Sequence, residues 1–292
     1  MFNGSIVALI TPFDERGIDR LALTRLIRYH LDNATSGIVP VGTTGEASVL
    51  SAEEPYRVIE KVVHEVGGQV PVLAGAGTNA PEAAIAFSNN AARAGADGVL
   101  HVAGYYNRPH QEGLYQHFRY VCERVDLPVV VYNVPPRAVV DILPETLARI
   151  AELPNVVGVK DATCDLTRPV RERNLIEKQF CFLSGEDSTA VAYNAHGGVG
   201  CISVTANIAP ALCAQIQRHC KENDFSAALE IQRRLMSLHR ALFLEPSPAG
   251  VKYAASLLGL TSDACRLPMV PLTEDTRRSI ESAMRSADVL SV

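Results

Sequence analysis

Short apolar segments alternate with longer amphipathic segments over the first 210 residues of the chain. The apolar segments are rich in valine, isoleucine and alanine, and they predict strands at residues 5–11, 37–41, 70–74, 98–102, 129–133, 156–160, 180–184 and 200–204. The amphipathic segments predict helices at residues 20–33, 52–66, 81–94, 111–125, 144–152, 167–176 and 188–196. Strands that alternate with helices pair in parallel, and nearly continuous apolar strands are covered on both faces. The even spacing therefore favours a closed (β/α)8 TIM barrel over an open sheet.

After Pro210 the pattern is only helical, and it predicts segments at residues 211–222, 225–243, 249–258 and 273–286. We interpret residues 1–222 as the barrel and residues 223–292 as a helical extension packed on it. A chain of 292 residues suits a single barrel of this kind, which typically needs about 250 residues.

Charge and composition exclude several classes of function. A net charge of −5 gives no reason to expect a nucleic-acid or membrane partner, and no apolar run reaches the ~18 residues of a membrane span. The start of the chain has no basic segment before its apolar run, so we expect no signal peptide. The seven cysteines are scattered and form no C-x-x-C pair, which favours a reduced, cytoplasmic setting.

Barrel enzymes carry their catalytic groups where the strands end, and polar residues gather there in this sequence. Lys160 is the sharpest candidate among the five lysines, because it closes the apolar run 156–159. Loss of solvation there favours the free amine, which can attack a ketone to form a Schiff base. Lys252 is the rival amine, but it lies in a helical segment outside the predicted strands.

A Schiff-base reaction also needs a group that moves protons. Tyr132 ends the strand before that of Lys160, and Thr43 with Tyr106 can extend it into a relay. The turn that holds Thr43 and Thr44 offers hydroxyls and backbone amides that suit a small carboxylate. Arg137 follows two prolines, and its guanidinium suits a second carboxylate.

These residues lie in motifs that resemble the dihydrodipicolinate synthase branch of the pyruvate-dependent aldolases. The motifs are GTTGE at 42–46, YYNRP at 105–109, YNVP at 132–135, GVKDAT at 158–163, LSGED at 183–187, ISVTAN at 202–207 and LEPSP at 244–248. They cover essentially the whole chain in the order and spacing of the family.

The resemblance implies that Lys160 condenses with pyruvate and that the enamine attacks aspartate 4-semialdehyde, with no metal or organic cofactor. Tyr132, Thr43 and Tyr106 match the family's proton relay, in which Tyr106 comes from a neighbouring subunit of a homotetramer. Arg137 matches the position that binds the carboxylate of the semialdehyde. Thr44, Gly185 and the backbone of Ile202 match the pyruvate contacts.

Departures from the family pattern raise separate expectations. Gly104 and Gly250 stand where the family usually has proline, so we expect looser segments there; Ala103 also departs. Ala52, Pro55 and Ala83 replace two histidines and a glutamate that hold lysine in inhibitable members. We therefore expect weak or absent feedback inhibition by lysine.

Three alternative functions share some of these features. A lyase of sialic acid or 2-keto-3-deoxy-sugar acids would share the Schiff base, but Arg137 disfavours a sugar acceptor. A binding protein that kept a pyruvate pocket would not need an amine beside a phenol. The eight histidines show no H-x-H or H-E-x-x-H spacing, so a metal-dependent aldolase is disfavoured.

Overall fold

The computed structural model describes residues 2–102 and 104–290, and eight parallel strands form its central sheet. The strands are β1 (Gly4–Ala8), β4 (Gly37–Val39), β5 (Leu73–Gly75), β6 (Gly98–Val102), β7 (Val129–Asn133), β8 (Val156–Asp161), β9 (Cys181–Ser184) and β10 (Gly200–Ser203). Their order in the sheet is β4-β1-β10-β9-β8-β7-β6-β5. A parallel bridge between Ile38 and Val72 joins the two end strands. The predicted barrel is confirmed.

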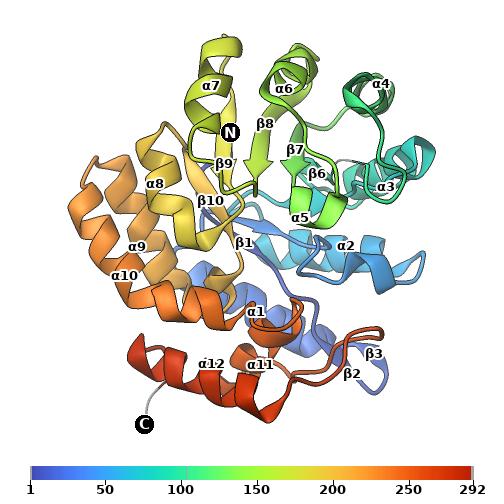
Figure 1. Ribbon diagram of the computed structural model, residues 1–292. Coiled ribbons are helices and arrows are strands. Elements are labelled where there is room, and N and C mark those ends of the chain that lie inside the picture. The colour runs from blue at the N-terminus through green and yellow to red at the C-terminus, as the bar shows by residue number, and fades with distance from the viewer. Residues whose placement is uncertain (1, 103, 291–292) are drawn as a thin grey trace.

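Eight helices surround the strands, as the amphipathic pattern predicts (Figure 1). They are α1 (Arg20–Asp32), α2 (Glu54–Val66), α3 (Pro81–Arg93), α4 (Gln111–Cys122), α6 (Pro144–Ala151), α7 (Arg168–Leu175), α8 (Ala190–Ala195) and α9 (Pro210–Lys221). Their starts have local causes. The Asp19 side chain accepts hydrogen bonds from the first backbone amides of α1, and proline occupies the first turn of α3 and α6.

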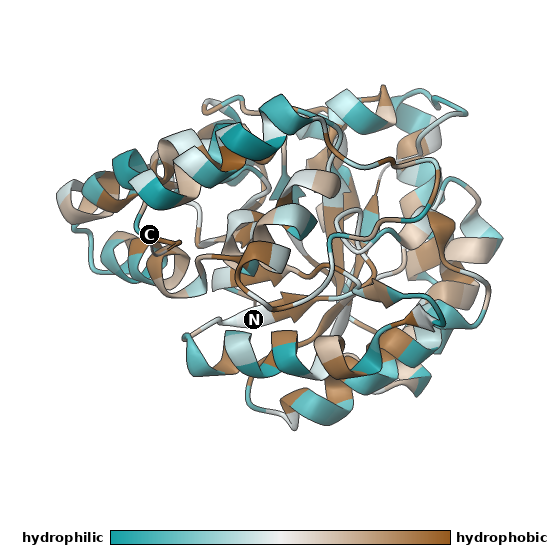
Figure 2. Ribbon diagram, turned by 90° about the horizontal axis from the view of Figure 1, so that it is seen from below, coloured by the Kyte–Doolittle hydropathy of each residue, from teal (hydrophilic) through white to brown (hydrophobic). Residues whose placement is uncertain are grey.

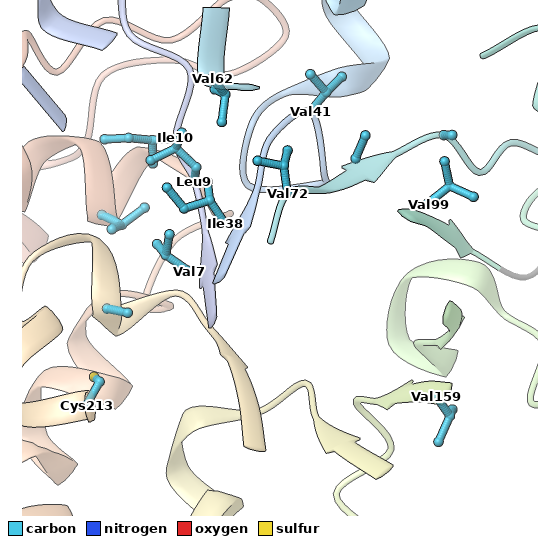
Figure 3. Packing of buried hydrophobic residues seen from close by; sticks show 14 of the residues in the cluster. Val7, Leu9, Ile10, Ile38, Val41, Val62, Val72, Val99, Val159 and Cys213 are labelled. Carbon is cyan, nitrogen blue, oxygen red and sulfur yellow. The ribbon is translucent and has the colours of Figure 1, made fainter. Parts of the chain in front are cut away.

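Alternate residues of each strand face opposite sides of the barrel wall. Val7 packs outward against the helices, whereas its neighbours Ile6 and Ala8 face the barrel interior. Figure 3 shows Val7 with Ile38 and Val72 on adjoining strands and Val62 from α2. In Figure 2 the strands are mainly brown, which marks hydrophobic residues, whereas much of the teal, which marks hydrophilic residues, lies on the surrounding helices. The strands are therefore apolar on both faces because helices cover one face and side chains fill the other.

Three further helices follow the barrel: α10 (Phe225–Ala241), α11 (Ala249–Leu257) and α12 (Glu274–Ser286). In the structure α10 packs against α9 and α12, and α11 packs against α12 (Figure 1). The division of the chain at residue 222 stays a prediction. A side chain at Gly250 would place its Cβ 2.5 Å from the Leu242 carbonyl oxygen, so glycine here allows a close backbone approach.

The apolar pattern missed several short elements. β1 ends at Ala8 instead of continuing to Thr11, and a hairpin of β2 (Phe13–Asp14) and β3 (Gly17–Ile18) follows it. The single-turn helix α5 (Pro135–Ala138) comes after β7. Elements of two to four residues are too short to show a periodicity.

Candidate active site

The amine of Lys160 and the phenol ring of Tyr132 meet at the ends of adjoining strands. The two residues are direct partners in the β7–β8 register, and both face the barrel interior. Their exposed fractions are 6% and 8%, and the Lys160 Nζ lies 4.2 Å from the centroid of the Tyr132 ring. The structure thus places a water-poor amine against a phenol ring. The catalytic roles of both residues stay predictions.

Two other predicted residues lie around this amine. A Cβ at Gly185 would lie 2.9 Å from the Ala162 Cβ and 3.1 Å from the Lys160 Cε, so the backbone at Gly185 packs closely against the lysine side chain. Ile202 on β10 belongs to the same interior cluster as Tyr132. Four of the predicted site residues therefore surround one region of the barrel interior.

The loop after β4, residues 42–46, which we name the threonine loop, carries Thr43 and Thr44. Thr44 is buried and Thr43 is exposed. The Glu46 N–H donates to the Thr43 carbonyl at 3.1 Å, which closes the turn. The Gly45 carbonyl accepts a hydrogen bond from the Thr11 hydroxyl at 2.7 Å. The loop is thus a compact turn with one hydroxyl inside and one outside.

Tyr106 lies apart from the other relay candidates. Its side chain is 90% exposed and its φ is 69°, whereas the neighbouring Tyr105 hydroxyl lies 3.1 Å from the Thr78 hydroxyl. Within the described residues, no hydrogen bond joins Tyr132 to Thr43 or Tyr106. A single chain therefore does not assemble the relay. That Tyr106 enters the site from a neighbouring subunit stays a prediction.

Arg137 sits on α5 and is exposed. Its backbone N–H donates to the Val134 carbonyl at 3.0 Å, in the stiff turn that the two prolines begin. In the part of the chain that the structure describes, its guanidinium has no carboxylate partner. The group is therefore free to bind an anion at the rim of the barrel.

A cluster of acids around Arg168 lies on the outer side of the same two strands, and sequence reasoning did not find it. The Arg168 Nη1 lies 2.9 Å from both carboxylate oxygens of Asp141, and its Nε lies 3.2 Å from Glu172 and 3.8 Å from Asp161. The Asn133 amide donates to Asp141 at 2.7 Å. Because Asn133 and Asp161 follow Tyr132 and Lys160, their side chains point the opposite way, toward α7.

Burial dominates the electrostatics of this cluster. It raises the pKa of Glu172 to about 8, and the nearby Asp161 adds to the effect. The pKa of Asp161 is also raised, chiefly by burial. One of these carboxyl groups therefore holds a proton near neutral pH.

Lys252, the rival amine, is more buried than Lys160. It is 0% exposed, and its Nζ lies 2.5 Å from a carboxylate oxygen of Glu46. Burial lowers the pKa of Lys252, but the Glu46 carboxylate opposes that shift. Lys160 has no such carboxylate partner among the described residues. The two buried lysines therefore differ in their partners: Lys252 pairs with the Glu46 carboxylate, whereas Lys160 packs against the Tyr132 ring.

No group of three or more His, Cys, Asp or Glu side chains within residues 2–102 and 104–290 has the geometry to hold a metal ion. Across the same residues, no helix has the length and apolar content to cross a membrane.

A closed parallel barrel with an unpaired, buried lysine at a strand end is typical of the aldolase class of barrel enzymes. Comparison with known proteins defines the family within that class. The chain belongs to the dihydrodipicolinate synthetase family, whose model matches residues 1–287.

Relatives and solved structures match over nearly the whole chain. A protein of Parvibaculum lavamentivorans named 4-hydroxy-tetrahydrodipicolinate synthase is 52% identical over 291 residues, which is 100% of both chains. A protein of the same name from Rhodospirillum centenum is 53% identical, also over 100% of both chains. A pyruvate complex of dihydrodipicolinate synthase from Acinetobacter baumannii superposes with a TM-score of 0.97 at 40% identity, over 99% of this chain and 100% of that one.

Proposed function

We propose that this chain is a lyase that condenses pyruvate with L-aspartate 4-semialdehyde to give 4-hydroxy-tetrahydrodipicolinate, a reaction of diaminopimelate and lysine biosynthesis. The full-length relatives at about half identity that carry this activity in their name support the proposal. Their names also favour it over a lyase of sialic acid or 2-keto-3-deoxy-sugar acids. The observation that carries the mechanism is the buried, unpaired amine of Lys160 against Tyr132.

The reaction starts at the Lys160 amine. Its nitrogen adds to the C2 carbonyl of pyruvate, and the carbinolamine loses water to give an imine. Loss of a proton from the methyl group gives an enamine, whose carbon attacks the aldehyde of the semialdehyde. The substrate's own amine then adds to C2, closes the ring and displaces the Lys160 nitrogen.

Each remaining site residue has a role in this scheme. Tyr132 moves protons at the carbinolamine and enamine stages, with Thr43 and a neighbouring copy's Tyr106 completing the relay. Exclusion of bulk water from the barrel makes such a relay necessary.

The two substrates have separate anchors. Thr44 and the backbone of Ile202 bind the pyruvate carboxylate, and the absence of a side chain at Gly185 leaves room beside Lys160. Arg137 binds the carboxylate of the semialdehyde. The scheme needs no metal or organic cofactor.

The assembly and location form part of the proposal. Tyr106 can act in the proton relay only if it enters the site of another copy of the chain, which supports an oligomer. We propose that this oligomer is a homotetramer. A solved relative with a TM-score of 0.96 and 38% identity, over 99% of this chain and 98% of that one, is described as a monomeric variant of dihydrodipicolinate synthase. All seven cysteines are free, which supports a reducing, cytoplasmic setting.

A coupled assay with pyruvate and aspartate semialdehyde tests the proposal. We expect Lys160→Ala to lower kcat by roughly three orders of magnitude or more, because no other group can form the imine. Lys61→Ala is the matched control, because this lysine lies on α2 in an i,i+4 pair with Glu65. Turnover by Lys160→Ala at the wild-type rate would contradict the mechanism, and a wild-type chain without activity on this substrate pair would contradict the function.

A further inference from the structure

The carboxylate of Glu46, the last residue of the threonine loop, is held entirely by the helical extension. Glu46 is 4% exposed. One of its carboxylate oxygens accepts a hydrogen bond from the Lys252 Nζ at 2.5 Å, and the other accepts from the backbone N–H of Arg266 at 2.9 Å. These partners lie 206 and 220 residues further along the chain. The last residue of the loop is thus fixed from outside the barrel.

The ion pair is shielded from water on its other side as well. The Lys252 Nζ lies 4.1 Å from the centroid of the Phe13 ring, and the Arg266 guanidinium lies over the same ring at 4.4 Å. Arg266 makes a two-point contact with Glu54, with both N···O distances at 2.6 Å. Two cations therefore face two carboxylates around one aromatic ring, and we name this set the Glu46 cluster.

Stability alone is a poor explanation for such a pair. Removal of two charges from water costs about as much as their attraction returns, and apolar replacements of similar volume are often neutral or stabilising. An ion pair does, however, fix the direction of a side chain that an apolar contact would leave free to slide. The pair is better suited to setting a position than to adding stability.

The threonine loop has a backbone that needs such fixing. Val41 just before it and Glu46 at its end both have a φ of 57°, in the left-handed region that side chains rarely adopt. Such conformations persist only where surrounding contacts impose them. Beside Val41 the chain packs closely, since a Cβ at Gly75 would lie 2.1 Å from the Val41 carbonyl oxygen. At Glu46 the surrounding contacts are those of its carboxylate with Lys252 and the Arg266 N–H.

We propose that Glu46 and Lys252 are positioning residues for pyruvate. The pair holds Glu46 in its left-handed conformation, and the hydrogen bond from the Glu46 N–H to the Thr43 carbonyl transmits that position to the two threonines. The helical extension thereby sets the affinity for the keto acid. This inference rests on the proposed function, in which the threonine loop binds pyruvate.

The variants Lys252→Met, Glu46→Gln and the double variant test the inference in the full-length chain. For all three we expect the KM for pyruvate to rise about tenfold or more, because small displacements of a binding group are costly, while the KM for the semialdehyde stays within about twofold. Trapping of the pyruvate adduct with borohydride should slow in parallel. Lys61→Met is the matched control: its Nζ also lies 2.5 Å from a glutamate, Glu65, but it does not touch the loop.

The double variant separates positioning from stability. The single changes leave one buried charge unpaired and should lower the Tm, whereas the double variant removes both charges and should recover most of that loss. We expect its KM for pyruvate to remain high. A double variant with recovered Tm and the wild-type KM for pyruvate would overturn the inference, and so would an equal rise in both KM values. If the wild-type chain itself gave no borohydride-trapped adduct, the proposed function would fail first.

Discussion

Two partly buried ion clusters flank the candidate site, and they differ in charge balance. In the Glu46 cluster the cations Lys252 and Arg266 face Glu46 and Glu54. In the second, which we name the Arg168 cluster, a single guanidinium faces three carboxylates, those of Asp141, Asp161 and Glu172. A balanced cluster keeps all its charges, whereas a cluster with surplus carboxylates must hold a proton.

The pKa values reflect this difference. The hydrogen bond with Arg266 lowers the pKa of Glu54 to about 2, so this group is ionised at every physiological pH. Burial raises the pKa of Glu172 to about 8. Only the Arg168 cluster therefore links the stability of the barrel to pH near neutrality.

The largest expected effect is the loss of the only cation of the Arg168 cluster. Arg168→Met leaves three carboxylates without a cation. We expect the free energy of unfolding to fall by an amount at the upper end of the about 3–5 kcal/mol typical of broken buried pairs. The loss of stability in Lys252→Met should lie at the lower end of the same range, because Glu46 keeps its hydrogen bond from the backbone N–H of Arg266. Denaturant unfolding measures both.

Arg171→Met provides the control for Arg168. It lies on the same helix, and its pair with Glu145 is exposed, so its loss should cost no more than about 0.5 kcal/mol. A larger loss in the free energy of unfolding for Lys252→Met than for Arg168→Met would contradict this comparison of the two clusters.

The next effect concerns pH. The folded chain holds the Glu172 proton up to about pH 8, whereas the unfolded chain releases it near the ordinary value of 4.5. Ionisation thus costs the folded state stability as the pH rises through this window. Glu172→Gln removes this cost, so the free energy of unfolding of the variant, relative to wild type, should increase between pH 5 and 8 by up to about 1.4 kcal/mol per pH unit.

Glu54→Gln is the matched control for this titration. The pKa of Glu54 is lowered to about 2, so its contribution to the free energy of unfolding changes only below its ordinary pKa of 4.5. The free energy of unfolding of Glu54→Gln should therefore run parallel to that of wild type between pH 5 and 8. A pH-independent difference between Glu172→Gln and wild type over the same range would show that Glu172 is ionised in the folded chain.

The smallest expected effect lies outside both clusters. At the positions that hold lysine in inhibitable relatives, Asn79 and Tyr105 are present, but Ala52, Pro55 and Ala83 offer no carboxylate for the lysine ammonium. We expect weak or absent inhibition by lysine in the coupled assay, equal in wild type and in the variants of either cluster. Complete inhibition at sub-millimolar lysine would contradict this expectation.

The parts of the molecule that the sequence predicted correctly depend on local patterns. Apolar runs located all eight strands, and the register of β7 and β8 then placed Tyr132 beside Lys160. The two-residue strands of the hairpin were missed because they are too short to alternate.

The long-range contacts could not be predicted in the same way. Glu46 and Lys252 meet across 206 residues, and the apolar helical segment around Lys252 does not indicate which carboxylate Lys252 meets. Arg168 stands in a strongly polar helix that looks solvated. Two of its three carboxylate partners come from elsewhere, from the loop after α5 and from β8. The relay of Tyr132, Thr43 and Tyr106 remains a prediction, because the single chain leaves Tyr106 outside.

The most direct measurement is to treat the wild-type chain with pyruvate and borohydride and to locate the adduct by peptide mass mapping. We expect one reduced pyruvate adduct, on Lys160, and none on Lys252, whose amine is held by Glu46. An adduct on Lys252, or no adduct at all, would contradict the claim that the unpaired amine beside Tyr132 is the nucleophile.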